Sequence, residues 1–352
     1  MKTTKAPNAL SLRSSLEFCK ILQSLDVEIE HAIDFAATGS VEPCGMLMVS
    51  SELQRLQTRC NLKVEFENYR HMTYAGHMGF FKAFRHEYGK WPGEANGGNN
   101  YIPLTILDTG QIRKEALETL REEGDVVEER SEQLASTLIG DDTGEVFETL
   151  AYSIREIIRN VVEHSEASQI GLCGLYWPSK GRAEIAIIDR GRGLSAALAP
   201  NPHIDVSTDK QAINWALMPA ISGVAFEGAK KRNRDSPWVN SGFGLYMTNR
   251  ICRNGGNFFI SSGDTGMLLT ASGEGKRYFS TSHEGTVVRM IIDTNQRDSL
   301  QKSLERYRNE GYEIQHKYKE VVRIDPSAAS LMLSKDFDVT LWDKLLSKLK
   351  GR

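Results

Sequence analysis

Several features that would assign this chain to a common class of protein are absent from its sequence. No apolar stretch is long enough to span a membrane, and residues 1–10 contain no hydrophobic signal core. The five cysteines are odd in number, widely spaced and without a Cys-x-x-Cys pair, which argues against a zinc site and for reduced thiols. A formal net charge of −3 gives no reason to expect a nucleic-acid or membrane surface. We therefore expect a cytoplasmic protein that binds neither.

The common phosphate-binding and zinc-protease motifs are missing as well. The sequence contains no Gly-x-x-x-x-Gly-Lys-Ser/Thr and no Gly-x-Gly-x-x-Gly after a strand. The His-Glu pairs at His86 and His283 lack the second histidine of a zinc-protease helix. His86 is also disfavoured as a phospho-acceptor, because Gly89 interrupts its segment. The chain instead has an ordinary globular composition, 40% hydrophobic and 25% charged, and its 352 residues favour two domains.

The most regular helical pattern runs from Thr143 to His164. Asp142 or Thr143 can cap it, with Glu145 completing a capping box. Its apolar residues recur at helical spacing and form one face for a core. Another face carries a carboxylate, an amide, a second carboxylate and an imidazole, at Glu156, Asn160, Glu163 and His164. Such a row could hold a metal-bound anion; a solvated helix face is the alternative.

Two later segments combine regular structure with glycines. Residues 183–188 are an apolar run typical of a strand, and they lead directly into Asp189-Arg190-Gly191-Arg192-Gly193. Ser241-Gly242-Phe243-Gly244-Leu245 opens a second helix over residues 246–253, which Gly255-Gly256 closes. Glycines allow close approach of the backbone to a ligand, and a helix N-terminus after them offers free amides to phosphate.

Three boxes occur in a fixed order: Glu156-xxx-Asn160, Asp189-x-Gly191-x-Gly193 and Gly242-x-Gly244-Leu245, followed by Gly285-Thr286 before a strand at 287–292. Together they resemble the GHKL-type ATP-binding domain, the Bergerat fold, shared by sensor kinases, anti-sigma-factor kinases, gyrase-type topoisomerases, mismatch-repair ATPases and heat-shock chaperones. The resemblance covers about residues 142–294. It implies an α/β fold, an α+β two-layer sandwich, with ATP and Mg²⁺ as cofactors.

The resemblance assigns roles to the residues of the long helix. Asn160 would ligate Mg²⁺ through its side-chain carbonyl. Glu156, one turn earlier, would orient and deprotonate the attacking water as the catalytic residue. His164 matches a position that the family fills with a cationic side chain near the phosphates, although the charge of a histidine there is uncertain at neutral pH.

The other boxes would hold the base and the phosphates. Asp189 can accept a hydrogen bond from the exocyclic amine of adenine, where guanine presents an oxygen and would leave the acid unpaired. By resemblance Thr286 supports this contact, and Gly191 and Gly193 leave room for the base, whereas Arg190 and Arg192 are expected to point to solvent. Further binding residues are assigned near the phosphates, namely Gly242, Gly244 and the amide of Leu245.

A nucleotide lid is expected between the glycine boxes. A helix over residues 209–217 precedes it, and residues 223–241 would form the lid itself. Four basic residues could reach the γ-phosphate on closure: Lys230, Lys231, Arg232 and Arg234. The alternative is a solvated flexible loop.

Residues 1–110 are expected to form a smaller α/β domain, with strands at 45–49, 62–66 and 101–107 and helices at 51–59 and 75–84. The segment 74–81 resembles a helix of STAS-like regulatory domains; an unrelated α/β domain is the alternative. Residues 111–141 contain an acidic stretch without aromatic residues, typical of a solvated helical connector, and the domain boundary is placed near Gly140.

Residues 295–352 extend beyond the expected ATP-binding domain. The pattern predicts an amphipathic helix over 299–308, a strand at 320–324 and a second helix over 340–349. Such a tail would pack on its own domain, or its last helix would dock a partner protein or a second subunit.

The sequence therefore predicts an Mg-dependent ATP-binding protein and slow ATPase that acts as a conformational switch through lid closure and regulates a partner protein. One alternative is a protein serine/threonine kinase of the anti-sigma-factor type. The other is a non-hydrolysing ATP-gated module for dimerisation or assembly, with the N-terminal domain or the C-terminal helix as the interface.

Overall fold

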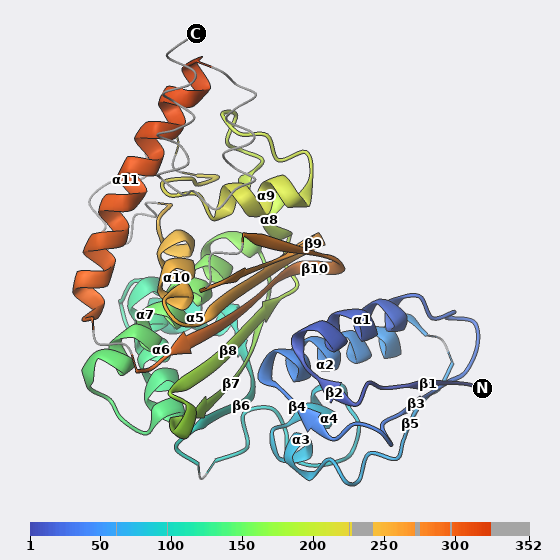
Figure 1. Ribbon diagram of the computed structural model, residues 1–352. Coiled ribbons are helices and arrows are strands. Elements are labelled where there is room, and N and C mark those ends of the chain that lie inside the picture. The colour runs from blue at the N-terminus through green and yellow to red at the C-terminus, as the bar shows by residue number, and fades with distance from the viewer. Residues whose placement is uncertain are drawn as a thin grey trace.

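The structure is a computed structural model that describes residues 1–60, 62–96, 98–224, 226, 242–271, 275–295 and 298–324. Most of the expected lid, including its basic residues, and the expected helix over 340–349 lie outside the described residues. The fold is a mixed α/β arrangement with several sheets, as the sequence predicted at that level (Figure 1). No helix among the described residues is long and apolar enough to cross a lipid bilayer.

The N-terminal unit is built on a parallel sheet with the strand order β1-β3-β5. Its helices include α2, a buried 17-residue helix. The bounds of its elements are β1 Lys2–Lys5, β2 Ala9–Leu10, α1 Leu12–Gln23, β3 His31–Asp34, β4 Ser40–Val41, α2 Pro43–Arg59, β5 Val64–Glu67, α3 Thr73–His77 and α4 Phe80–Ala83. Strands β2 and β4 form a second, two-stranded parallel sheet.

Two local predictions for this unit were wrong. The apolar run at 45–49 is not a strand but the first half of α2, which begins with Pro43 at a position where a helix needs no amide donor. The run is apolar all round because α2 is covered on several sides, and a short buried helix segment then has the same composition as a buried strand. The helix expected over 75–84 is divided into α3 and α4 by Gly79, which has φ +88°.

The second unit is organised around an antiparallel sheet with the strand order β6-β7-β8-β10-β9. The strands expected at 183–188 and 287–292 lie in the neighbouring strands β8 and β10, which confirms them. Their register places Thr286 opposite Asp189. The bounds of the strands are β6 Tyr101–Asp108, β7 Gln169–Trp177, β8 Arg182–Asp189, β9 Asn257–Thr270 and β10 Lys276–Asp293.

Helices α5, α6, α7 and α10 lie to one side of this sheet (Figure 1). The long helix predicted from residue 143 is α7, and its last turn continues as a π-helical turn, η1. The helix expected after Gly244 is α10, and the helix before the expected lid is α9. The bounds of these elements are α5 Thr109–Glu118, α6 Glu123–Ile139, α7 Gly144–Asn160, η1 Val161–Ser165, η2 Pro178–Lys180, α8 Gly193–Leu198, α9 Asp209–Ala216 and α10 Gly244–Arg253.

Two segments assigned to other parts of the chain belong to this second unit. Strand β6, expected in the first domain, pairs with β7 at the edge of the five-stranded sheet. Helix α6 is not a solvated connector, because Val126, Val127, Ala135 and Leu138 are buried in the same core as α7. Most acidic residues of this segment are exposed, and Glu128 pairs with Arg155 of α7. The five-stranded sheet therefore begins near residue 101, well before Gly140.

Helix α2 of the N-terminal unit covers the opposite face of the five-stranded sheet (Figure 1). Its Leu47 and neighbouring apolar residues share one buried core with Cys173, Ile188 and Val287 of strands β7, β8 and β10. Each face of the sheet thus contacts its own apolar layer, which is why residues 183–188 are buried without alternation. The two units form one continuous structure with an extensive apolar contact.

A buried ionic network fixes the start of α2 on the sheet. Glu184 of β8 is fully buried and accepts from the backbone amide of Cys44 at 3.3 Å. It also accepts from Arg289 of β10 through Nε at 3.0 Å and Nη2 at 2.8 Å. Arg289 in turn contacts Glu42, just before α2, at 3.2 Å. The carboxylate is thereby paired and its remaining acceptor sites are used, as burial of a charge requires.

The tail forms a single long helix, α11 (Leu300–Ile324), in the described residues. The expected strand at 320–324 is instead the last part of this helix. Tyr307 and Ile314 of α11 are buried against α10 and the residues after α9, and the ring of Tyr318 contacts that of Trp215 at 5.4 Å. The tail therefore packs on its own unit as far as residue 318.

The Arg289–Glu184 pair provides a test of this packing. Arg289→Ala should reduce the free energy of unfolding by about 3–5 kcal/mol, because Glu184 would remain as an uncompensated buried charge. Arg289→Met combined with Glu184→Leu should recover most of that loss. Urea unfolding of the three proteins measures the effect, and a single variant as stable as the wild type would contradict the assigned burial.

Candidate functional site

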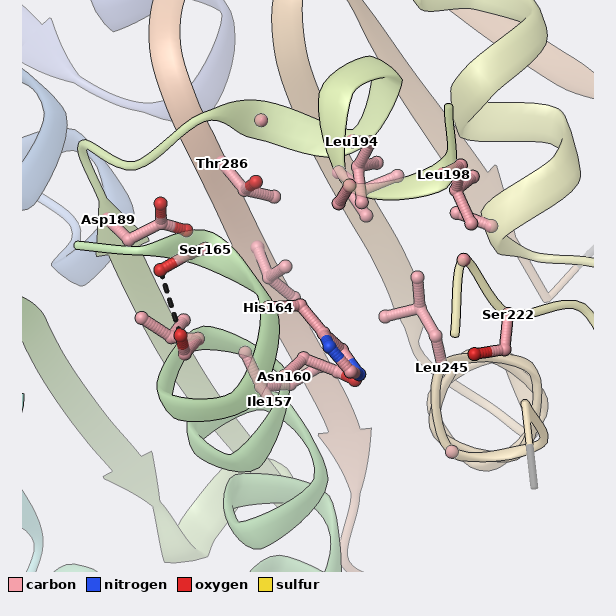
Figure 2. A pocket seen from close by; sticks show the side chains of 18 of the residues that line it. Ile157, Asn160, His164, Ser165, Asp189, Leu194, Leu198, Ser222, Leu245 and Thr286 are labelled. Atoms are coloured by element: carbon pink, nitrogen blue, oxygen red, sulfur yellow. Dashed lines mark hydrogen bonds between the residues drawn. The ribbon is translucent and has the colours of Figure 1, made fainter. Parts of the chain in front are cut away.

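One cavity lies between η1, the end of β8, the middle of β10, α8 and the start of α10 (Figure 2). It holds about 870 Å³ of empty space, part of it open to solvent, a size in the range of small-molecule sites. Eight of the ten site residues predicted from the sequence line it. They are Asn160, His164, Asp189, Gly193, Gly242, Gly244, Leu245 and Thr286. The three boxes, far apart in sequence, therefore converge on one cavity.

The cavity has polar groups at several points along walls that are mainly apolar. Figure 2 shows Asp189 and Thr286 at one end, Ser222 and Leu245 at the other, and Asn160 and His164 between them. Its walls carry apolar residues from several elements: Ile157, Val161, Ile187, Leu194, Ala197, Leu198, Ala216, Ile221, Ile260 and Val288. No lysine or arginine lines it among the residues that the structure describes. A flat, uncharged group with a polar edge would suit the middle of this cavity.

Asp189 is held at the closed end by a specific set of donors. Its side chain is 3% exposed and accepts from the amide of Gly191 at 2.8 Å. Thr286, opposite it in the β8–β10 register, donates through both its hydroxyl and its amide. Burial raises the pKa of the Asp189 carboxyl to about 6, although these hydrogen bonds act in the opposite direction. The carboxylate is therefore mostly ionised at pH 7 and ready to accept from a ligand.

Asn160 and His164 lie one turn apart at the end of α7 and in η1. The π-helical turn widens the helix at this point, a feature frequent at functional sites. Burial lowers the pKa of His164, although Glu163 beside it acts in the opposite direction. The imidazole is thus neutral at pH 7. A cationic role for this position, which the family resemblance raised, is not supported by its surroundings.

The start of α10 forms the third side of the cavity. Phe243 is the N-cap, and Gly244 and Leu245 are the first helical residues, so their amides have no partner within the helix. A Cβ atom at Gly244 would lie 2.1 Å from Oε2 of Glu156. Glycine is required here because the helix start approaches the Glu156 carboxylate so closely. The free amides and the helix dipole favour a negatively charged group at this end.

Glu156 does not line the cavity, in contrast to its expected catalytic position. Its side chain is 11% exposed and lies behind Gly244, with Oε1 3.1 Å from Nη2 of Arg155. Arg155 also contacts Glu128 of α6 at 3.1 Å. The carboxylate is therefore adjacent to the α10 end of the cavity but is held by an ion pair.

Gly191 is close to the cavity without lining it. A Cβ there would lie 2.0 Å from the carbonyl oxygen of Ser165. The absence of a side chain at residue 191 therefore allows the turn to pack on η1, and it does not make room for a base. Arg190 and Arg192 do not simply point to solvent. Arg192 donates to the carbonyl of His164 at 2.7 Å, and Arg190 donates to Ser51 of α2 at 2.9 Å.

Sequence reasoning missed several lining residues. Leu194 and Leu198 of α8 form one wall, and Ser165 and Ser222 add hydroxyls. The i, i+4 spacing of the two leucines directly after Gly193 was the available signal for the wall. The two serines follow no motif, and only the folding of their segments brings them to the cavity.

Three comparisons with known proteins gave no match. No protein-family model matches this chain, and no similar curated protein or solved structure was found. The site is therefore interpreted from its own geometry.

The raised pKa of Asp189 makes a testable contribution to stability. A carboxyl whose pKa is higher in the folded state favours folding most below its unfolded pKa, near 4, and loses this contribution as pH rises through about 6. Asp189→Asn should remove that dependence. Between pH 4.5 and pH 7.5 the variant should gain about 1–3 kcal/mol of unfolding free energy relative to the wild type. If urea unfolding shows the same pH dependence of the unfolding free energy for the wild type and Asp189→Asn, the raised pKa assigned to Asp189 is contradicted.

Proposed function

We propose that the chain binds ATP with Mg²⁺ in this cavity and hydrolyses it slowly, and that residues 142–294 contain a domain of the Bergerat type. The observation that carries the proposal is the convergence of Asp189, Asn160 and the turn 242–245 on one cavity. Each supplies a different chemical group, and the three match the base, the metal and the phosphates of a nucleotide.

The closed end suits adenine. The Asp189 carboxylate accepts hydrogen bonds only, and its Gly191 and Thr286 contacts leave it able to accept from one more donor. The exocyclic amine of adenine is such a donor. Guanine places an oxygen at the corresponding position, so a buried carboxylate would face an acceptor and lose its partner. The apolar walls would cover the faces of the ring.

The end of the cavity at the start of α10 suits the phosphates. Among the described residues, the groups that favour negative charge at this end are the amides at the start of α10 and the dipole of that helix. Asn160 offers a side-chain carbonyl toward the same space (Figure 2). Mg²⁺, when bound, would neutralise phosphate oxygens and keep several of its waters. Asn160 would hold the ion, and the neutral His164 could donate or accept a single hydrogen bond beside it.

Hydrolysis would need Glu156 as the general base. Its carboxylate lies behind Gly244, so a side-chain rotation would have to bring it to a water beside the phosphates. Its ion pair with Arg155 must lengthen for that rotation. This pairing favours one second candidate, a non-hydrolysing ATP-gated module in which Glu156 stays bound to Arg155. Slow turnover is the outcome expected if both arrangements are populated.

Helix α11 is the described element best placed to transmit a nucleotide-dependent change. Its residues contact both α10, which carries the proposed phosphate end, and the segment after α9. The ring of Tyr312 lies 5.2 Å from that of Phe243, the N-cap of α10. A shift of α10 on nucleotide binding would therefore move α11. Regulation of a partner protein through this helix is part of the proposal.

The hydrolysis step predicts a specific defect. Glu156→Gln should lower the rate of phosphate release at least about 100-fold, the usual minimum contribution of a general base, and leave the affinity for MgATP within a few-fold. Glu128→Gln is the matched control, because it removes the other partner of Arg155 without touching the cavity. Equal turnover in the wild type and Glu156→Gln would favour the non-hydrolysing module, and labelled phosphate on a protein would favour the kinase alternative.

The two ends of the cavity predict separable effects on binding. Asp189→Asn should reduce the preference for ATP over GTP about tenfold or more, because the amide can pair with either base. Asn160→Ala should weaken the Mg-dependent part of the affinity about tenfold and leave the base preference unchanged. Calorimetry with MgATP, MgGTP and metal-free ATP measures both. Variants that alter neither quantity would contradict the proposed orientation of the nucleotide.

A further inference from the structure

The closed end of the cavity is supported from behind by the N-terminal unit. Strand β8 ends at Asp189, and the next residue, Arg190, extends away from the cavity toward α2 (Figure 1 shows α2 on this side of the sheet). Its Nε donates to Ser51 Oγ at 2.9 Å, and its Nη2 lies 3.5 Å from Oε2 of Glu52. The backbone next to the Asp189 carboxylate is thereby attached to a helix of the other unit.

The neighbouring strand carries a second set of contacts to the same unit. Glu284, two residues before Thr286, pairs with Arg55 of α2 at 2.6 Å. Gln23 at the end of α1 donates to the carbonyl of Ser282 at 3.3 Å and accepts from its hydroxyl. Asp189 at the end of β8 and Thr286 next to the irregular part of β10 are the two partners of the proposed adenine contact, and both therefore lie beside residues that contact the N-terminal unit.

A buried histidine links the end of β8 to the irregular part of β10. The ring of His283 is 7% exposed, and its Nε2 lies 2.9 Å from the carbonyl oxygen of Asp189. Burial lowers the pKa of His283 to about 3, with Arg190 as a further cause, so the ring is neutral and donates to that carbonyl. A displacement of β8 at Asp189 is thus transmitted to β10 at His283, and the reverse also holds.

The Arg190–Glu52 pair joins a buried carboxylate to a guanidinium that is 30% exposed, and its hydrogen bonding is incomplete. Glu52 is 2% exposed, and its Oε2 also accepts from Gln23 at 3.1 Å. Its Oε1 and the Nη1 of Arg190 have no hydrogen-bond partner among the described residues. A second cavity, about 770 Å³ of space that is partly open to solvent, lies beside Arg190, and its polar lining residues include Ser50, Ser51, Gln54, Ser168 and Gln169. The Arg190 side chain therefore borders open space on this side.

We propose that Arg190 is a positioning residue for the nucleotide site: by anchoring the Asp189 strand end to α2, it makes purine selectivity and docking of the N-terminal unit depend on each other. The proposal rests on the proposed function for its ligand. Because the coupling is thermodynamic, it acts in both directions: loosened docking weakens selection of adenine, and bound nucleotide tightens the docking of α2.

Four variants separate positioning from general stability. Arg190→Gln removes the guanidinium but leaves Glu52 buried without its cationic partner. Arg190→Gln combined with Glu52→Gln removes both charges and should restore stability. Arg190→Lys keeps the charge and loses the two-point contact. Arg59→Gln is the matched control, because Arg59 lies on α2 but donates to carbonyls of Leu22 and Gln23 within the N-terminal unit.

The first measurement is the affinity ratio of MgATP to MgGTP by calorimetry. We expect Arg190→Gln to lower the ratio at least about fivefold, Arg190→Lys to give an intermediate ratio, and Arg59→Gln to match the wild type. The double variant should unfold at the same urea concentration as the wild type and still show the lowered ratio. A wild-type ratio in Arg190→Gln, or a ratio that recovers together with stability in the double variant, would overturn the proposal.

The second measurement is hydrogen exchange of the backbone amides without nucleotide. Arg190→Gln should speed exchange at least about fivefold in the second half of α2 and in residues 187–193 and 283–287 together. Arg59→Gln should affect the N-terminal unit alone. Faster exchange confined to one side of the contact would overturn the positioning role. If the wild-type protein binds no adenine nucleotide, the proposed function fails, and this second measurement still decides whether Arg190 couples the two units.

Discussion

The five-stranded sheet is apolar on both faces, and two different parts of the chain must cover it. Helices α6, α7 and α10 cover one face and helix α2 of the N-terminal unit covers the other. At roughly 25 cal/mol per Å² of apolar surface, exposing either face would cost far more than the net stability of a domain of this size. The placement of both units, and the cavity at the end of the sheet, depends on this double burial.

The same constraint accounts for the buried charges. Where α2 crosses the sheet, Glu184 and Arg289 are paired in its interior, and Arg190 and Glu52 are paired at its edge. At the first cavity, Asp189 is buried with hydrogen-bond donors and, among the described residues, without a cationic partner, and its pKa rises accordingly. Of these charged groups, Asp189 is the one that lines this cavity. A buried carboxylate with its donors arranged around it and one free direction is the part of the structure most suited to recognising a ligand.

The sequence was sufficient where a pattern is local. Helix α7, strand β8 and helix α10, which have 17, 8 and 10 residues, follow from periodicity, apolar runs and glycine placement. The convergence of their motifs was expected only from the resemblance to the GHKL-type domain. The sequence was not sufficient where contacts between distant parts of the chain determine the secondary structure, the strand pairing or the direction of a side chain. The run at 45–49 is a helix because α2 is enclosed, β6 joins the second sheet because β7 offers it an edge, and Arg190 turns inward because Ser51 and Glu52 lie behind it. No local signal specifies these partners.

The central claim is that one adenine nucleotide occupies the cavity with its base at Asp189 and its phosphates at the start of α10. A crystal structure of the full chain with Mg²⁺ and a non-hydrolysable ATP analogue tests it most directly. The account predicts the exocyclic amine within hydrogen-bond distance of the Asp189 carboxylate, the metal at the Asn160 side chain and phosphate oxygens at the amides of residues 244 and 245. A nucleotide bound elsewhere on the molecule, or in this cavity with its phosphates at Asp189, would contradict it.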